Sequence, residues 1–500
     1  MNVLLIYPEF QVTFWSFEGL LKKFVGRKGA FPPLGLLTVA AMLPESWDKK
    51  MVDLNVRKLT DKDVKWADYV FVSAMYAQKD SAIKIVARCN KLAVPVVLGG
   101  PILELEATCN EFHGVRHFFL GESEETMPEF LADIEAGKAK RIYKPERFSD
   151  IKRTPIPLWK LINPNDYSSG LVQYSRACPF RCTFCNSKKV SGPVWRAKSP
   201  SQFISELDAM RRTGFGNSGG SVLFADENFI GNPRETKKML LELIAWQEKW
   251  GYPFEFTVQE PITLADDEEQ MEMQRKAGVV RAFVGIETFN EAALRECRKL
   301  QNLRRNLIEC VHRILQRGID VASGFIQGFE KDPPDTFADD MIDSIQKTGI
   351  AMAMVDTLQA QIGTELYARL EKEGRILRKA VSNTDVLGTN FVPAMPMEKL
   401  KEGYKRTIKT LYSPKKYFER ILIFLKNYDA SRRKRRRITP TDTKAFFKSV
   451  FWIGLLGGFK VSYYYWKTLL VAFFKYRQAF SEAVARQIYF VHFRKIAKAI

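Results

Sequence analysis

The stretch "YSRACPFRCTFCNSKK", residues 174–189, places Cys178, Cys182 and Cys185 within eight positions of a 500-residue chain that has only seven cysteines. The spacing is C-x3-C-x-F-C, with Phe184 directly before the third cysteine. A tetrahedral zinc site commonly takes four ligands from two separated pairs, whereas this stretch supplies three cysteines and no histidine. Three thiolates can instead hold a 4Fe-4S cluster and leave one iron open to a small molecule. The spacing therefore favours an iron–sulfur site.

The remaining cysteines are scattered along the chain. Their odd total and wide spacing do not resemble a disulfide framework and fit a reducing compartment. The opening "MNVLLIYPEF" lacks a basic n-region and reaches Pro8 and Glu9 before any apolar run of useful length. We therefore predict a cytosolic protein without a secretory signal.

The first 135 residues alternate strand-like and helix-like segments. Short apolar runs rich in β-formers occur at 2–8, 70–75 and 94–101, and helical patterns such as "SAIKIVARCNKLA" lie between them. Such alternation is typical of βαβ units around a parallel sheet. We predict a doubly wound α/β domain over residues 1–135, with any ligand at the carboxyl ends of its strands.

Three loops of this domain would frame such a ligand, at 73–78, 99–101 and 121–124. Gly99 and Gly100 permit close backbone approach to a bulky ligand. They fit a simple tight turn equally well. From the residues alone, both roles stay open.

Residues 136–169 are predicted to be a linker, because they are rich in charge and contain several prolines. Beyond them, six apolar β-type runs alternate with helical stretches: "LVQYSRA", "SVLFAD", "FEFTVQ", "AFVGIET", "VASGFIQG" and "MAMVDTLQ". A complete barrel of this type has eight strands, so six predict an open, partial (β/α)6 barrel over residues 170–365. Barrel chemistry lies at the C-terminal ends of the strands, and the cysteine stretch follows the first of the six.

The cysteine spacing, the aromatic residue before the third cysteine and the place after the first barrel strand resemble the radical S-adenosylmethionine (SAM) superfamily. The resemblance implies that the cluster passes an electron, received from an external flavodoxin-like or ferredoxin-like donor, to SAM. The 5′-deoxyadenosyl radical so released abstracts hydrogen from an unactivated carbon. The residues implied to contact SAM are Phe184, Asp226, Asn228, Glu287, Gly324, Ile326 and Gly328. Asp226 or Glu287 could accept bonds from the SAM ribose or ammonium, or be an ordinary solvated or capping carboxylate.

A doubly wound domain ahead of such a barrel, with "PPLGLL", "VVLGGP" and "FLGESEET", resembles the cobalamin-binding radical SAM class. Further segments, including "DENFIGN", "GFIQGF" and "LYSPKKYFER", resemble the subgroup that contains the hopanoid C-2 methylases. This resemblance implies methylation of an sp3 carbon of a hydrophobic, isoprenoid-like lipid, and thus lipid biosynthesis. It implies cobalamin contacts at Ser73, Gln78, Gly99, Gly100, Gly121 and Glu122.

Some positions depart from the family pattern. The D-x-H-x-x-G motif by which some cobalamin proteins ligate cobalt is absent, and we expect His113 and His117 to lie in a late loop. Ala177 stands where relatives usually have glycine, and Asn186 where the subgroup has aspartate. The segment "TVQEPITLADD" replaces the subgroup's usual "TEAS", on a strand that faces the reaction chamber. A radical reaction without methyl transfer, such as oxidative ring closure or carbon–carbon coupling on a lipid or tetrapyrrole, therefore stays open.

The net charge of +20 lies almost entirely in the last hundred residues, which hold 24 lysines and arginines against 5 aspartates and glutamates. We divide this part into a helical extension over 366–430 and a basic, aromatic tail over 431–500. The tail contains "SRRKRRR" at 431–437 and then aromatic runs whose longest uncharged stretch, 449–459, is too short to span a bilayer. Basic residues recurring among aromatics fit helices that lie in a membrane interface. The sequence therefore predicts a peripheral protein on the cytosolic face of an anionic membrane.

The same tail is compatible with RNA binding or with a packed helical bundle. Basic tracts with aromatics also bind RNA, and some radical SAM enzymes modify transfer RNA. Those methylthiotransferases carry a second cluster on three N-terminal cysteines, whereas only Cys89 and Cys109 precede the motif here. Nucleic acid is thus not the favoured partner. A bundle would pack the aromatic face of the tail on the barrel. Cys297 and Cys310 are most simply buried thiols.

Overall fold

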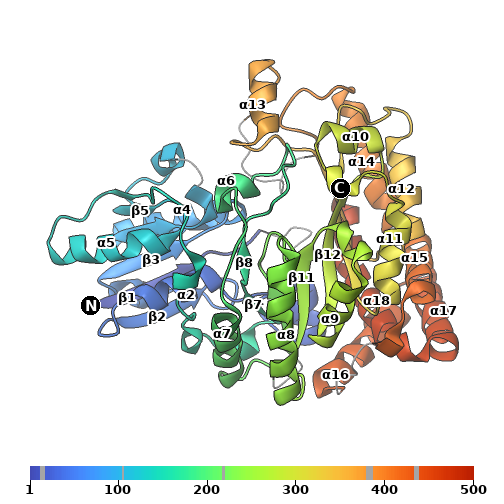
Figure 1. Cartoon of the computed structure of the whole chain (residues 1–500), viewed down its shortest axis with the longest axis horizontal. Helices are drawn as coiled ribbons and strands as arrows, with labels where there is room; N and C mark the ends of the chain where they lie inside the picture. The colour runs from blue at the N-terminus through green and yellow to red at the C-terminus, as the bar shows by residue number, and fades with distance from the viewer. Residues whose placement is uncertain (12–16, 104–105, 217–219, 379–386, 433–437) are drawn as a thin grey trace.

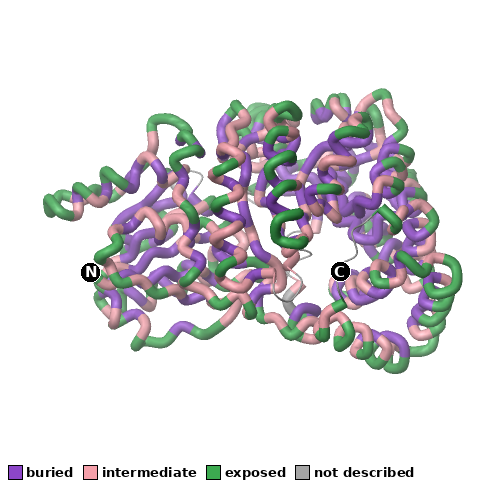
Figure 2. The backbone as a smooth tube through the Cα atoms, turned by 60° about the horizontal axis from the view of Figure 1, so that its bottom comes forward, coloured by how far each residue is buried: buried purple, intermediate pink, exposed green. Residues whose placement is uncertain are grey.

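The computed structural model describes the chain outside residues 12–16, 104–105, 217–219, 379–386 and 433–437. Two six-stranded parallel sheets lie side by side, and a group of helices follows them (Figure 1). Both sheets are buried along their strands, while the outer turns of the C-terminal helices are exposed (Figure 2). The predicted fold class, a doubly wound domain, a partial barrel and a helical C-terminal region, is confirmed.

The N-terminal sheet has the strand order β2-β1-β3-β4-β5-β6, which is a doubly wound arrangement. Its strands are β1 Asn2–Tyr7, β2 Asp48–Asp53, β3 Tyr69–Ser73, β4 Val96–Gly99, β5 His117–Phe119 and β6 Ile142–Tyr143. Alternate side chains of β1 enter different cores, because successive residues of a strand point to opposite faces. Helices α3 Asp61–Lys65 and α4 Lys79–Lys91 cover one face, and α2 Leu34–Met42 and α5 Ser123–Glu135 cover the other.

Two details of this domain differ from expectation. The sheet extends past residue 135, because β6 pairs in parallel with β5 at Phe118 and Phe119. A strand of two residues carries no periodicity by which the sequence could reveal it. His117 lies on β5 and not in a loop, and its Nδ1 lies 2.6 Å from the carbonyl oxygen of Lys140.

The second sheet follows chain order, β14-β13-β12-β11-β10-β7, and remains open between its edge strands β7 and β14. Its strands are β7 Ser169–Val172, β10 Gly220–Phe224, β11 Phe254–Glu260, β12 Val279–Glu287, β13 Asp320–Gln327 and β14 Ala353–Thr357. The intervening helices are α7 Pro200–Arg212, α8 Pro233–Lys249, α9 Glu268–Lys276, α10 Glu291–Glu296, α11 Leu307–Gln316, α12 Phe337–Thr348 and, after β14, α13 Glu365–Lys372. All neighbouring strands are parallel, as the six βα units predicted.

The last helix and a segment near residue 17 pack at the N-terminal end of this barrel. Helix α18 Phe480–Ala499 places Arg486 2.6 Å from Asp320 on β13, and Arg281 on β12 approaches the same carboxylate at 2.8 Å. The Phe17 ring stacks on His492 of α18, with centroids 4.5 Å apart. These contacts cover the N-terminal ends of β12 and β13, and the cavity described below lies at the opposite end of the strands.

The C-terminal helices pack against the outside of the barrel. They are α14 Met397–Leu411, α15 Pro414–Asn427, α16 Pro440–Ser449 and α17 Phe459–Lys475, with a π-helical segment, η11 Val450–Leu455, between the last two. Arg420 is fully buried between Tyr412 and Tyr417 and donates to Gln346 Oε1 at 2.6 Å. Arg433 to Arg437, most of the polybasic run, lie outside the described residues. Among the described helices, none is long and apolar enough to span a membrane.

Candidate active site

The cysteine loop connects the two strands of a small antiparallel hairpin. Strands β8 Ser175–Arg176 and β9 Arg196–Ala197 pair with each other and enclose the three cysteines and helix α6 Ser187–Ser191. The loop is tied to the barrel because the Thr183 N–H donates to the Cys297 carbonyl at 3.0 Å. Ala177 has φ of +73°, a conformation that favours glycine, which accounts for the glycine of the family pattern. Its N–H donates to Glu227 Oε2 at 2.9 Å.

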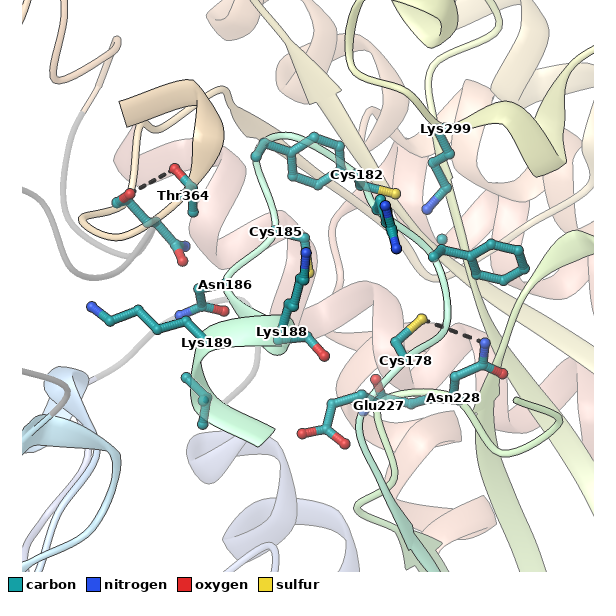
Figure 3. Close-up of a pocket in the computed structure, with 18 of the residues that line it drawn as sticks. Cys178, Cys182, Cys185, Asn186, Lys188, Lys189, Glu227, Asn228, Lys299 and Thr364 are labelled. Carbon is teal, nitrogen blue, oxygen red and sulfur yellow. Dashed lines mark hydrogen bonds between the residues drawn. The ribbon is translucent and has the colours of Figure 1, made fainter. Parts of the chain in front are cut away.

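Cys178, Cys182 and Cys185 line a single cavity of about 850 Å³ at the C-terminal ends of the barrel strands (Figure 3). Asn228 Nδ2 donates to Cys178 Sγ at 3.5 Å, and Gln301 Nε2 donates to Cys182 Sγ at 3.9 Å. Hydrogen bonds to sulfur of this kind tune the potential of an iron–sulfur cluster. Within the described ranges, no three His, Cys, Asp or Glu side chains stand close enough to share one metal ion. The three thiols are thus separate parts of the cavity wall.

A buried ion pair lies beside these thiols (Figure 3). Lys299 Nζ lies 2.6 Å from Glu287 Oε1, and both side chains are nearly buried. Although burial alone would lower the pKa of Lys299, the negative charge of Glu287 and its hydrogen bond to Lys299 raise it. Glu287 itself has φ of +65° at an irregularity in the β12–β13 register. A non-glycine residue in that region is strained, and such strain is concentrated at functional sites.

The predicted SAM contacts divide into two groups. Phe184, Asn228 and Glu287 line the cavity. Gly324 lies directly behind it, since a Cβ there would come within 3.6 Å of Phe283 and 4.0 Å of Glu287, which both line the cavity. The others do not line it: Asp226, Ile326 and Gly328.

Those three residues contact segments next to the cavity and do not line it themselves. Asp226 is 1% exposed and accepts hydrogen bonds from the N–H groups of Tyr174 and Ser175, at 2.9 and 2.8 Å, which fixes the start of the cysteine hairpin. Burial raises the pKa of Asp226 to about 7. Ile326 packs in the apolar cluster that includes Phe184. The Gly328 N–H donates to Asp332 Oδ2 at 2.9 Å and shapes the turn after β13.

Replacing Lys299 with methionine should make the reduction potential of a cluster bound by the three cysteines more negative. The reason is that Lys299 supplies positive charge beside Cys182 and Cys185. At a fixed reductant potential, SAM cleavage should slow by about tenfold or more. A redox titration followed by electron paramagnetic resonance measures the shift. Lys299→Arg keeps the charge and should retain the original potential, whereas equal potentials in the methionine variant and the unmodified protein would contradict the assignment.

A second cavity, of about 1030 Å³, lies at the carboxyl ends of the N-terminal strands. Ser73, Gly99, Gly100, Gly121 and Glu122 line it as predicted. Gln78 does not, because its side chain is buried and bridges the Pro8 carbonyl and the Met75 N–H. Gly100 has φ of +94° and a Cβ there would lie 2.6 Å from Ser73 Oγ, so its turn requires glycine. At Gly99 a Cβ would lie 3.4 Å from Phe119 Cβ, an ordinary van der Waals contact, so this position does not require glycine.

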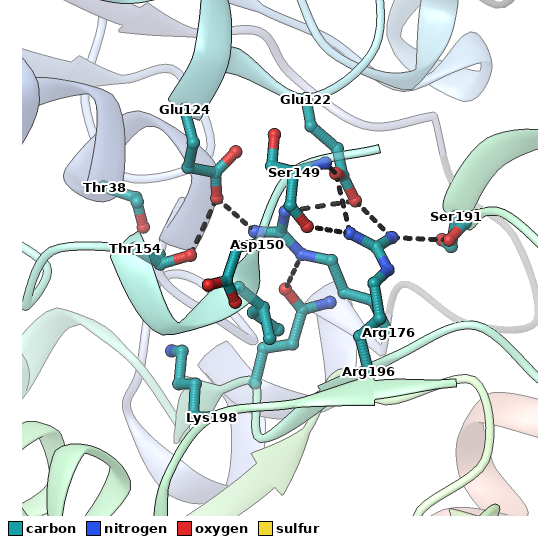
Figure 4. A network of polar contacts seen from close by, with 12 residues as sticks. Thr38, Glu122, Glu124, Ser149, Asp150, Thr154, Arg176, Ser191, Arg196 and Lys198 are labelled. Carbon is teal, nitrogen blue, oxygen red and sulfur yellow. Dashed lines mark hydrogen bonds and ion pairs between the residues drawn. The ribbon is translucent and has the colours of Figure 1, made fainter. Parts of the chain in front are cut away.

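A network of buried charges joins this cavity to the cysteine hairpin (Figure 4). Arg176 of β8 lies 2.7 Å from Glu124 Oε1 and 3.1 Å from Glu122 Oε1, and Arg196 of β9 lies 2.8 Å from Glu122 Oε1. Burial would raise the pKa of both carboxyls, but the two arginines hold it below the usual range. Glu122 thus lines the cavity while its carboxylate is held by the barrel domain. We call these four residues the interdomain clamp.

The two cavities share part of their walls. Met75, Pro101, Lys189, Val190 and Glu227 line both of them. A group bound on the N-terminal sheet and a group bound beside the cysteines would therefore face each other across a common boundary.

Comparisons with known proteins agree with this arrangement. The model of the radical SAM superfamily matches residues 172–342, and that of a domain of unknown function, DUF4070, matches residues 364–500. The hopanoid C-2 methylase of Rhodopseudomonas palustris is 30% identical over 488 residues, which are 94% of this chain and 89% of that protein. The chain belongs to the radical SAM superfamily, in the subgroup of that methylase.

Two further proteins resemble this radical SAM enzyme. A protein of Synechocystis sp. named as an uncharacterized methyltransferase is 37% identical over 421 residues, 84% of this chain and 78% of its own. The structure of OxsB, described as a cobalamin-dependent SAM radical enzyme with aqua-cobalamin and SAM bound, superposes with a TM-score of 0.64. That match covers 100% of this chain and 80% of OxsB at 14% identity, and so establishes a shared fold.

Several residues of the radical SAM site escaped the sequence reasoning: Glu227, Lys299, Gln301, Arg176 and Arg196. Only Glu227 had a detectable signal. Along β10 and beyond it, Phe224 and Asp226 are buried while Ala225 and Glu227 are partly exposed, so period-2 alternation places Glu227 on the cavity side. The other four lie in a loop, in the three-residue 3-10 helix η9 Leu300–Asn302 or in strands of two residues, which are too short for periodicity to indicate a direction.

Proposed function

We propose that this radical SAM enzyme is a cobalamin-dependent methyltransferase that acts on an unactivated sp3 carbon of a hydrophobic, isoprenoid-like lipid. One observation carries the proposal: the two cavities meet at a shared boundary, so that a methyl donor on the N-terminal sheet and a radical source at the cysteines could reach the same carbon. The relatives named as methyltransferases support the reaction class.

The residues present fit the groups that this reaction needs. When bound, a 4Fe-4S cluster with SAM supplies the radical that removes hydrogen, and cobalamin supplies the methyl group. Cys178, Cys182 and Cys185 would hold the cluster, and the amides of Asn228 and Gln301 donate toward two of their sulfurs. The Gly99–Gly100 turn leaves a broad cavity in which a corrin ring would fit above the strand ends.

The substrate is proposed to be hydrophobic because of the side chains near the boundary. Met75, Pro101 and Val190 line both cavities, and Tyr76 and Phe180 line the cysteine cavity beside them. These apolar side chains, beside the charged Lys189 and Glu227 of the same boundary, would receive an apolar carbon skeleton. A lipid substrate also suits an enzyme that works on the cytosolic face of a membrane, which we include in the proposal.

Metal analysis of anaerobically reconstituted protein tests the cofactors. After incubation with hydroxocobalamin and desalting, we expect about four iron and about one cobalt per chain, with a corrinoid absorption spectrum. Gly99→Leu adds a bulky side chain to the wall of the second cavity, so it should lower bound cobalt while leaving iron unchanged. Cobalt that stays at the same level in this variant would be bound nonspecifically. Labelled methyl from SAM should then appear in an apolar product.

Iron without cobalt would refute the methyl-transfer proposal. The radical core would still be supported, and an oxidative ring closure or coupling without cobalamin would take its place. The family relation to a methylase makes the methyl-transfer outcome the expected one.

A further inference from the structure

Exposed apolar side chains are concentrated in one short part of the chain. Of the 24 large hydrophobic residues exposed in the described structure, 12 lie between residues 438 and 474. Phe459 is 90% exposed and Phe474 is 76% exposed. Scattered apolar residues on a surface are ordinary, but a contiguous patch of this kind marks a site of interaction.

Helix α17 explains how the patch arises. Val461, Tyr465 and Leu469 are buried against the neighbouring helices α15 and α18, which use one side of α17 for packing. The opposite side would be polar in an ordinary surface helix. Here it carries a stripe at spacings of three and four residues, composed of Phe459, Tyr463, Trp466, Leu470 and Phe474, and Leu455 at the end of η11 is exposed shortly before the helix. We call these six residues the aromatic face.

The charge around the aromatic face has one sign. From residue 443 to residue 481 the sequence contains six lysines and arginines and no aspartate or glutamate. Lys460, Lys467 and Lys475 are exposed on the same helix as the stripe. Tyrosine and tryptophan beside lysine are the residues favoured where hydrocarbon meets lipid headgroups.

We infer that the aromatic face docks onto an anionic lipid bilayer, with α17 lying flat in the headgroup region. At 1.5 Å rise per residue, its 17 residues present a side about 25 Å long. The inference rests on the proposed work at a membrane, and it assigns binding to this folded face and not to the polybasic run alone. Packing in a helical bundle buries one side of α17 but leaves the aromatic face exposed. Membrane docking gives that exposed face a role.

Docking in this way keeps the active site accessible. In Figure 1, α16 and α17 lie at the lower right, apart from α6 in the upper centre and α13 at the top of the molecule. Residues of α6 and of the start of α13 line the cysteine cavity. A protein bound through α17 therefore leaves that cavity open to an electron donor.

Vesicle sedimentation of the full-length, cluster-reconstituted protein tests the inference. We expect binding to vesicles of phosphatidylglycerol and phosphatidylcholine, and weaker binding to phosphatidylcholine alone. The triple variant L455S/F459S/F474S should lower partitioning by about tenfold or more, since three exposed apolar side chains are lost. Leu241→Ser, at an exposed leucine on α8, is the matched control and should bind like the unmodified protein.

Three results would overturn the inference. Unchanged binding by the triple variant would do so, as would loss of binding only when the basic residues 432–437 are changed to glutamine. A concentration-dependent dimer in analytical ultracentrifugation that the triple variant abolishes, without vesicle binding, would assign the face to a second copy. Vesicle binding requires no cobalamin. The docking inference can therefore be tested even if the protein binds no cobalt and the proposed methyl transfer is refuted.

Discussion

Changing Cys178, Cys182 or Cys185 to alanine is expected to lower bound iron from about four to below about one per chain and to abolish SAM cleavage. The three thiols line one cavity and no fourth described cysteine does. Losing any one leaves an iron without its protein ligand. Iron determination and detection of 5′-deoxyadenosine after reduction measure the two effects.

The remaining cysteines provide the control for this prediction. Cys310 is buried on α11 and does not line the cavity, so Cys310→Ala should keep both iron and cleavage. Cys297 lies nearer, but its thiol is 2% exposed and faces the Leu294 carbonyl at 3.6 Å. Full iron and full cleavage in a Cys182→Ala protein would refute the ligand assignment.

The barrel and the cysteine site were predictable because their evidence is local. Each barrel strand is a run of β-forming residues followed by a helical period, and right-handed βα connections then leave essentially one strand order. The cysteine spacing needs no knowledge of distant contacts. Glu287 was also predictable, since it shares a strand face with Phe283 and Gly285, which line the cavity.

The residues that sequence reasoning missed depend on contacts between distant segments. Arg176 and Glu124 are separated by 52 positions, and nothing in either local pattern indicates that they meet. Asp226 and Glu227 are adjacent acids, yet one holds the hairpin and the other lines both cavities. The family pattern predicts that the segment containing these two acids belongs to the site. Only the structure shows that Glu227 and not Asp226 lines the cavity.

The aromatic face illustrates a different limit. The sequence predicted that aromatic and basic residues of the tail serve one surface, whereas the structure divides the aromatics of α17 between a buried side and an exposed one. Aromatic residues occur on both the buried and the exposed sides of α17, so their pattern in the sequence does not show which side packs. The packing of α17 against α15 and α18 therefore had to be seen before the exposed side could be identified.

The second large effect is expected at the interdomain clamp. Arg176→Gln should destabilise the contact between the two α/β domains by about 3 to 5 kcal/mol, because it leaves Glu124 buried without a cation and Glu122 with Arg196 alone. The thermal unfolding midpoint should fall accordingly. Arg153→Gln removes an exposed ion pair with Glu125 and, as the matched control, should cost less than about 1 kcal/mol.

The functional result of the same change follows from where Arg176 lies. It is two residues before Cys178, and its partners belong to the loop that lines the second cavity. If the clamp sets the two cavities against each other, Arg176→Gln should keep its iron and still cleave SAM, while methyl transfer to product falls by about a hundredfold. A ratio of cleavage to transfer unchanged from the unmodified protein would show that Arg176 contributes stability only. In the double variant Arg176→Gln/Glu124→Gln, the second change removes the unpaired charge of Glu124. A partial recovery of the thermal unfolding midpoint would show that this unpaired carboxylate causes the loss of stability.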